Sequence, residues 1–261
     1  MDWIKVGHEC MRWTFESLRN ARLDILDENG SDAHAAVNVH TVADTDAQNA
    51  ILEVLKEEKI ACRVIAEQGS GEIFLNGGGK TQVIIDPIDN SALFARGETS
   101  FCAVGMFIVG DGFPVYSFVG DISTGEVYCC DRERSYKNGE LAMIPKKTIG
   151  KPVLAGWAPY SPRLEKFFEK FSKLQQREYL MFNYGQMLQS AKIVDGRYDA
   201  CFEILPAKLQ EFAGAIIAWR AGGELTTMEG NPIVWDANVK QTMLVSRNKE
   251  LHQKLLTAFN T

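Results

Sequence analysis

The stretch Ile84-Ile85-Asp86-Pro87-Ile88-Asp89-Asn90-Ser91 joins the end of an apolar run to two acidic residues and two small polar ones. The run before Asp86 predicts a buried strand, and the proline after it predicts a turn. Pro87 fixes its own φ angle and favours an extended backbone at Asp86, so the carboxylates of Asp86 and Asp89 can converge on one point. This stretch therefore predicts a strand that carries two carboxylates into a turn.

Two carboxylates, together with the peptide carbonyl between them, form a site of hard oxygen ligands. Such ligands suit Mg²⁺, Mn²⁺ or Ca²⁺, whereas Zn²⁺ prefers nitrogen and sulfur. The backbone N–H groups of Asn90 and Ser91, with the Ser91 hydroxyl, are available to receive phosphate oxygens. The alternative interpretation is a plain Asp-Pro turn between two strands, because that dipeptide is common in turns.

The motif resembles the D-P-(I/L)-D-(G/S)-(T/S) signature of the inositol monophosphatase and fructose-1,6-bisphosphatase superfamily of metal-dependent phosphatases. Four further segments resemble motifs of that superfamily, in the usual order and at the usual spacing. They are Ala43-Asp44-Thr45-Asp46 for T-x-x-D, Ile65-Ala66-Glu67-Gln68 for a strand that ends in a metal-binding glutamate, Gly196-Arg197-Tyr198-Asp199-Ala200 for G-x-x-D-A, and Arg220-Ala221-Gly222-Gly223 for E-A-G-G. Together the five segments extend the resemblance over nearly the whole chain.

The resemblance implies the fold class α+β / α/β, as a layered αβαβα sandwich of the inositol monophosphatase type. Hydrophobic periodicity predicts helices at 2–28 and 46–59, the second capped by Thr45 or Asp44, and strands at 63–66 and 82–86. An antiparallel meander is predicted over 103–109, 115–119 and 126–130. Beyond a change of composition at 145–151, helices near 164–174, 184–195, 208–221 and 248–259 alternate with strands at 179–182, 198–203, 224–227 and 243–246. We therefore predict an N-terminal α+β lobe with the metal site at 1–147, and a C-terminal α/β lobe at 148–261 that completes the substrate pocket.

The resemblance also implies which residues hold the metal and act on the attacking water. The expected metal ligands are Glu67, Asp86, the carbonyl of Ile88, and Asp89. Ser91, hydrogen-bonded to Asp46, is expected to position and deprotonate the water together with Glu67. The expected catalytic residues are therefore Glu67, Ser91 and Asp46.

For substrate binding the resemblance implies three residues. Asn90 and Ser91 are expected at the phosphate, and Glu203 aligns without gaps with the acid that contacts sugar hydroxyls in inositol monophosphatases. The alternative for Glu203 is a surface acid at the end of a strand. The family threonine is Ser91 here, which keeps the hydroxyl. The family glycine is Asn90, a residue that tolerates unusual φ angles better than most.

One departure from the family pattern concerns the second metal site. Relatives carry Trp-Asp on the helix that leads to E-A-G-G, and that aspartate is a metal ligand. Ungapped counting from either neighbouring motif places Leu209 and Gln210 at these positions. A gap of one residue would bring Glu211 into the aspartate position, but a deletion inside a helix rotates everything after it by about 100°. We therefore expect Gln210 at the second metal site, with one negative charge fewer than in relatives.

Composition limits the other possibilities. A net charge of −6 argues against a protein that binds a nucleic-acid backbone, which normally presents a basic face. The chain has no C-x-x-C pair among its cysteines, which favours buried free thiols over disulfides or zinc. There is no signal-peptide pattern and no apolar run near the ~20 residues that span a bilayer. We expect a cytoplasmic protein without a membrane partner, and the resemblance implies a homodimer.

Two functional classes remain open. The first is an active Mg²⁺-dependent phosphatase, with Mn²⁺ as the second choice, acting on a small sugar or polyol phosphate such as inositol 1-phosphate or fructose 1,6-bisphosphate. A nucleotide 3′-phosphate is a further alternative, although no added pocket for a base is evident. The second class is a degenerate relative that binds metal and a phosphorylated ligand with little or no turnover. The retained acidic and hydroxyl residues favour the active enzyme.

Overall fold

The computed structural model describes residues 2–19, 21, 25–28, 39–66, 72–146, 150–157, 165, 168, 172, 174, 178–183 and 187–260. Within these residues, eight strands form a first sheet in the order β10-β9-β8-β7-β6-β5-β3-β4. They are β3 (Cys62–Ala66), β4 (Glu72–Leu75), β5 (Gln82–Asp89), β6 (Ala103–Gly110), β7 (Phe113–Asp121), β8 (Val127–Cys130), β9 (Ser135–Lys137) and β10 (Glu140–Ala142). Among these described strands, only β3 and β5 pair in parallel; the remaining neighbours are antiparallel.

A second sheet has five described strands in the order β12-β11-β13-β15-β14. They are β11 (Val153–Trp157), β12 (Leu180–Asn183), β13 (Ala200–Ala207), β14 (Glu224–Thr226) and β15 (Gln241–Ser246), and β1 (Ile25–Glu28) pairs separately with β2 (Val39–Thr41). The described helices are α1 (Trp3–Leu18), α2 (Val42–Glu57), α3 (Ser91–Phe94), α5 (Met187–Ala191), the 3₁₀ helix η1 (Leu209–Phe212), α6 (Ala213–Arg220) and α7 (Lys249–Asn260).

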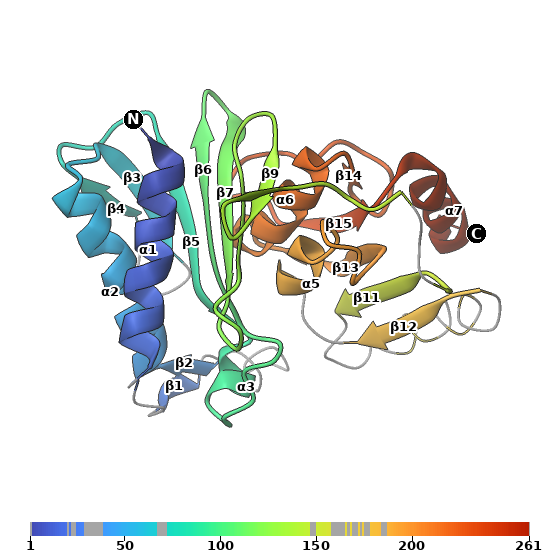
Figure 1. Ribbon diagram of the computed structural model, residues 1–261, viewed down its shortest axis with the longest axis horizontal. Coiled ribbons are helices and arrows are strands. Elements are labelled where there is room, and N and C mark those ends of the chain that lie inside the picture. Colours follow the sequence, from blue (N-terminus) through green and yellow to red (C-terminus); the bar gives the residue numbers. More distant parts are fainter. Residues whose placement is uncertain are drawn as a thin grey trace.

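These elements stack as five layers (Figure 1), with α1 and α2 on one side of the first sheet and α5 and α6 between the sheets. The alternation of side chains along β5 explains the stacking, because successive residues of a strand point to opposite faces. Val83 and Ile85 pack against α1 and α2, whereas Ile84 packs against α5 and α6. On the second sheet, Cys201 faces the same middle layer and Phe202 faces α7. The predicted αβαβα sandwich is confirmed.

Most predicted elements are present, with two corrections near the N-terminus. The helix expected over 2–28 ends at Leu18, and residues 25–28 form a strand instead. The helix expected to begin near residue 46 begins at Val42 and is capped by Thr41, so neither Thr45 nor Asp44 is its cap. The helix predicted over 164–174 lies largely outside the described residues. The chain leaves the first sheet at Ala142 and enters the second at Val153, and the division at 147 stays a proposal.

Two of the resembling segments hold the fold together. In the G-x-x-D-A segment, buried Asp199 accepts a hydrogen bond from the Val153 N–H at 2.8 Å and lies 2.6 Å from the Arg247 guanidinium. Arg247 also donates to the carbonyl of Pro145, at the exit from the first sheet. In the E-A-G-G segment, Arg220 replaces the glutamate and donates to the Pro114 carbonyl at 3.0 Å. These contacts join the second sheet and α6 to the first sheet.

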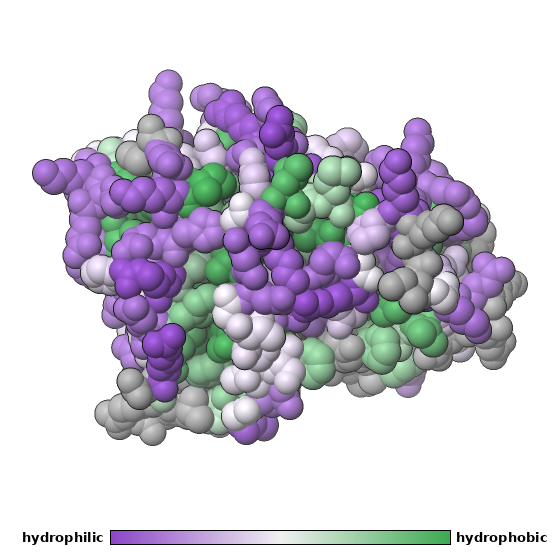
Figure 2. Space-filling model, viewed as in Figure 1, coloured by the Kyte–Doolittle hydropathy of each residue, from purple (hydrophilic) through white to green (hydrophobic). Residues whose placement is uncertain are grey.

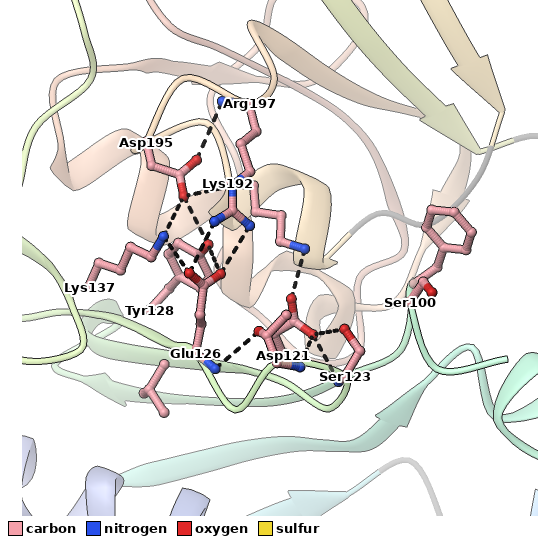
Figure 3. A network of polar contacts seen from close by, with 12 residues as sticks. Ser100, Asp121, Ser123, Glu126, Tyr128, Lys137, Lys192, Asp195 and Arg197 are labelled. Atoms are coloured by element: carbon pink, nitrogen blue, oxygen red, sulfur yellow. Dashed lines mark hydrogen bonds and ion pairs between the residues drawn. The ribbon is translucent and has the colours of Figure 1, made fainter. Parts of the chain in front are cut away.

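Charged side chains also fasten the segment after α5 to the first sheet (Figure 3). Lys192 lies 2.8 Å from buried Asp121, at the end of β7. Glu126, just before β8, lies 3.0 Å from Arg197 and 2.7 Å from Lys137. Burial tends to raise the pKa of Glu126, but hydrogen bonds from Arg197 and Lys137 outweigh it and bring the pKa to about 2. The middle layer is therefore tied to the first sheet by ion pairs as well as by apolar packing.

All six cysteines are free and buried, as expected from their positions in apolar runs. They lie at positions 10, 62, 102, 129, 130 and 201, which places them in several different layers. Burial raises the pKa of Cys10 to about 12 and that of Cys62 to about 11, because the thiolate would lose its hydration. Such thiols behave as small apolar residues of the core.

The surface in Figure 2 is mostly hydrophilic on the face shown. Hydrophobic side chains gather on it over β9 and α6 and over β11 and β12. In the part of the chain that the structure describes, there is no helix with the length and apolar character needed to cross a membrane.

Candidate active site

The end of β5 carries the acidic residues of the motif. Beyond Asp86, which pairs with Gly105, the ladder to β6 is irregular until Asp89 pairs with Ala103. Pro87 lies in this irregular part, where its missing N–H costs no ladder hydrogen bond. Asp86 is 2% exposed, and one oxygen of each carboxylate is buried, Oδ1 of Asp86 and Oδ2 of Asp89. Contrary to the expectation of a strand that stops at Asp86, the strand continues to Asp89.

Asp86 lies on the face of the first sheet that meets the middle layer, because it is two residues from Ile84. Its partner Gly105 has no side chain, and a Cβ atom there would collide with Met187 of α5 and come within 3.6 Å of Ala213. This glycine lets the middle layer approach the sheet beside Asp86. Three residues before Ala213, Gln210 belongs to η1, which contacts both β5 and β6.

Gln210 is 6% exposed, and its neighbour Glu211 is half-buried. The 3₁₀ helix that holds Gln210 contacts β5, the strand that carries Asp86 and Asp89. Lys208 precedes η1 with an extended backbone and is also half-buried. Whether Gln210 serves as a metal ligand stays a prediction.

Ser91, the last residue of the motif, begins α3, and its hydroxyl contacts buried Asp44. Ser91 Oγ lies 2.6 Å from Asp44 Oδ1, while Asp44 Oδ2 accepts the N–H of Thr41 at 2.8 Å and the Thr41 hydroxyl at 2.6 Å. The predicted hydrogen bond from Ser91 to Asp46 is therefore wrong. Residues two apart on a helix point about 200° apart, so Asp46 cannot face Ser91 when Asp44 does.

The sequence did contain the signal for Asp44. Thr41-Val42-Ala43-Asp44 has T-x-x-D spacing, and the same four residues form a capping box at the start of α2. The segment Ala43-Asp44-Thr45-Asp46 begins two residues after this one, and for that reason it pointed to Asp46 as the partner of Ser91. The cap fixes the Asp44 carboxylate toward the first turn of α2, which is why it can also receive the Ser91 hydroxyl.

The Ser91 hydroxyl has two acceptors within reach, because its oxygen also lies 2.7 Å from the Ile88 carbonyl. A hydroxyl carries one proton, so it donates to Asp44 or to Ile88 at any moment. A cation on the Ile88 carbonyl would compete for that oxygen and would favour donation to Asp44. The contact thus couples the expected ligand at Ile88 to the Ser91–Asp44 pair.

Glu203 lies in β13 between Trp157 and Met243 and is 1% exposed. The alternative that it is a surface acid is wrong. It is two residues from Cys201, so it faces the middle layer from the second sheet, as Asp86 does from the first. Its Oε1 accepts the N–H of Leu205 at 3.0 Å. Its contact with substrate stays a prediction.

The donor set fits a hard divalent cation. Asp86 and Asp89 bring buried carboxylate oxygens, and carboxylate oxygens are the ligands that Mg²⁺ and Ca²⁺ prefer. Glu67 lies outside the described residues. Among the described residues there is no group of three His, Cys, Asp or Glu side chains that could hold a metal ion.

Negative charge near the motif also affects Cys102, which lies just before β6. Burial is the main cause that raises its pKa to about 12, and the charges of Asp89 and Glu98 add to it. Its Sγ lies 3.1 Å from the Glu98 carbonyl. A thiol with so high a pKa is mostly protonated at neutral pH and is therefore a weak nucleophile.

Comparison with known proteins finds one family over most of the chain. Residues 7–261 match the model of the inositol monophosphatase family. A fructose-1,6-bisphosphatase/inositol-1-monophosphatase from Archaeoglobus fulgidus is 28% identical over 228 residues, 82% of this chain and 81% of that protein. An inositol-1-monophosphatase from Bacillus subtilis is 24% identical, over 99% of this chain and 97% of that protein. The crystal structure of the extragenic suppressor protein suhB from Bartonella henselae has a TM-score of 0.80 at 19% identity, covering 98% of this chain and 96% of its own.

Proposed function

The chain belongs to the inositol monophosphatase family, whose members are metal-dependent phosphoric monoester hydrolases, and we propose that this member hydrolyses a small sugar or polyol phosphate with Mg²⁺. One observation carries the proposal. Immediately after the two carboxylates of β5, the Ser91 hydroxyl is held 2.6 Å from buried Asp44. This arrangement combines carboxylates suited to a hard cation with a hydroxyl that has a buried carboxylate as one of its two acceptors.

The proposed metal ligands are Glu67, Asp86, the Ile88 carbonyl and Asp89, with the Gln210 amide oxygen at a second position. When bound, Mg²⁺ supplies positive charge that offsets the repulsion between a phosphate ester and an attacking water. Mn²⁺, which also takes oxygen ligands, is the second choice. With Gln210 in place of an aspartate, the second position has the weaker attraction for a cation.

The protein groups orient the water. When Ser91 donates its proton to Asp44, the lone pairs of Ser91 Oγ are free to accept a hydrogen bond from that water. Glu67 is the proposed acceptor of the proton that the water loses, as the resemblance implies. Asp44 takes the place of Asp46 in this proposal, because Asp44 is the residue in contact with Ser91.

The proposed substrate presents hydroxyl groups to Glu203 and its phosphate to the backbone at Asn90 and Ser91. Glu203 supports this choice because its carboxylate is buried and faces the middle layer, as Asp86 does from the opposite sheet. Inositol 1-phosphate and fructose 1,6-bisphosphate are the first candidates, in line with the names of the relatives. We also propose a cytoplasmic homodimer without nucleic-acid partners; the six reduced thiols support a reducing compartment.

The direct test is phosphate release from a panel of sugar, inositol and nucleotide monophosphates, with Mg²⁺ or Mn²⁺ titrated. We expect turnover of at least one polyol or sugar phosphate that requires the metal. Release from nucleotide 3′-phosphates alone would assign a different substrate class. Metal binding without turnover of any member would assign the degenerate class.

Replacing Glu203 by alanine is expected to raise KM for polyol phosphates by about 10-fold, because one hydrogen bond to a charged group contributes roughly 1.5 kcal/mol or more. An aryl phosphate without hydroxyl groups should show little change, since it has nothing to donate to the carboxylate. Steady-state kinetics with both substrates measure the difference. Equal changes in KM for the two substrates would place Glu203 outside the pocket.

Replacing Gln210 by aspartate is expected to lower the Mg²⁺ concentration for half-maximal activity by about 10-fold, equivalent to ~1.4 kcal/mol. Mg²⁺ gives up its waters reluctantly, so a site with few carboxylates fills only at high concentration. Replacing Glu211 by aspartate is the matched control and should leave the Mg²⁺ dependence unchanged.

Because the Lys208 side chain is charged, the Mg²⁺ titration of Gln210→Asp is carried out both with and without this lysine. An ammonium that reaches the site would stand in for a cation and would pair with the new aspartate. The titration is therefore repeated with Lys208 replaced by alanine. If Gln210→Asp leaves the Mg²⁺ dependence unchanged in both backgrounds, Gln210 does not face the metals and the ungapped alignment is wrong.

A further inference from the structure

Asn90 stands between the last carboxylate of β5 and the Ser91 hydroxyl, at the position where the family pattern has glycine. Its backbone is in the left-handed region, with φ 67° and ψ 42°. This explains why asparagine is accepted there, since it adopts that conformation more readily than other residues with a side chain. Asparagine differs from glycine in bringing an amide to the position.

That amide has a definite partner. Asn90 Nδ2 donates to the carbonyl of Phe101 at 2.9 Å. Asp89 pairs with Ala103 at the end of the β5–β6 ladder, and Asn90 and Phe101 lie just beyond that pair. The side-chain bond therefore continues the connection between the two strands beyond the point where their backbones separate.

The main chain of Asn90 is held on its other side. Its carbonyl accepts the N–H groups of Leu93 at 2.9 Å and Phe94 at 3.1 Å, in the first turn of α3. The residue thus connects the end of the ladder to α3, and Ser91 is the next residue along the chain. Glycine at this position would keep the carbonyl contacts and would lose the link to Phe101.

We propose that the Asn90 side chain is a positioning element that fixes Ser91 against Asp44 by tying the start of α3 to the Phe101 carbonyl. The proposal rests on the proposed function for its effect on turnover. The effect of the Asn90 side chain on the position of Ser91 does not depend on turnover, so it can be measured in the metal-free protein. In this chain the amide limits the freedom that glycine would allow between Asp89 and Ser91.

The test compares Asn90→Gly with a matched control, Asn76→Gly. Asn76 also has a positive φ, 50°, and its Nδ2 donates to the Ile60 carbonyl at 3.0 Å, but it lies at the end of β4. Each substitution removes the amide of a left-handed residue, where glycine is conformationally permissive; Asn76 loses a second, longer contact as well, from Nδ2 to the Leu55 carbonyl at 3.4 Å. We expect both variants to melt within about 3 °C of the wild type.

Two readouts separate positioning from stability. In the metal-free protein, amide hydrogen exchange over 90–102 should accelerate by about 10-fold or more in Asn90→Gly and stay unchanged in Asn76→Gly. With substrate and Mg²⁺, kcat of Asn90→Gly should fall by about 10-fold with KM within about 2-fold, because displaced catalytic groups cost rate rather than binding. Asn76→Gly should keep the wild-type kcat.

Each outcome decides the inference. Unchanged exchange over 90–102 overturns it, whatever the activity. Faster exchange with a wild-type kcat also overturns it, since the amide would then stabilise the loop without positioning Ser91. Faster exchange with a lower kcat supports it. If the wild type hydrolyses no phosphate ester, the proposed function fails, and the metal-free exchange at Ser91 and Ala92 still decides whether Asn90 fixes them.

Discussion

Replacing Asp86 by asparagine is expected to reduce kcat by about 10³-fold or more, equivalent to about 4 kcal/mol in the activation free energy. Asparagine has nearly the same shape as aspartate, so the packing against Gly105 and the middle layer should survive. The lost negative charge is the feature that a divalent cation needs at this buried position. Phosphate release gives kcat, and calorimetric titration gives the affinity for Mg²⁺.

The metal-free stability of this variant is a second observable. Asparagine is nearly isosteric with aspartate, so Asp86→Asn should melt near the wild-type temperature, and this result separates a loss of activity from a loss of the fold. Asp111, in the exposed turn between β6 and β7, offers a matched control: Asp111→Asn makes the same change at a position with positive φ that asparagine accepts. Wild-type kcat in Asp86→Asn would show that the active site lies elsewhere.

Replacing Asp199 by alanine is expected to lower the free energy of unfolding by about 3 to 5 kcal/mol, because the buried guanidinium of Arg247 would lose its carboxylate. The Val153 N–H would lose its acceptor as well. The effect should be nearly independent of salt, since both side chains are at most 5% exposed. Denaturant unfolding monitored by fluorescence measures it.

Two further variants make that prediction sharper. Asp199→Ala combined with Arg247→Met should recover part of the lost stability, because the pair is then removed without leaving a buried charge. Lys254→Met, which breaks the exposed pair with Glu250, is the control and should leave the unfolding midpoint unchanged. A small loss in Asp199→Ala would mean that water replaces the carboxylate beside Arg247.

The part of the site predicted from sequence was the part encoded in one contiguous stretch. The apolar run and the D-P-I-D sequence predict where β5 begins and the order of its acids, although the strand continues to Asp89, and Asn90 is a residue that tolerates the positive φ found there. The partner of Ser91 was missed because it depends on where α2 begins. A shift of two residues in that start changes which of Asp44 and Asp46 faces the sheet.

The sequence pattern also does not predict the shortest strands. The strands β4, β9 and β10 have three or four residues each, too few for alternation to be recognised. In β11, Leu154 faces α7 and Ala155 faces the middle layer, so both successive side chains are apolar and buried. The end of α1 at Leu18 carries no glycine or proline, and the apolar periodicity continues past it.

The buried thiols can be used to follow how this protein unfolds. Alkylating reagents attack the thiolate, so cysteines that are both buried and raised in pKa react only when the structure around them unfolds. Cys10 lies in α1, Cys62 in β3 and Cys201 in β13, in three different layers. Pulse labelling followed by peptide mass measurement would therefore show the order in which the layers separate, with no engineered probe.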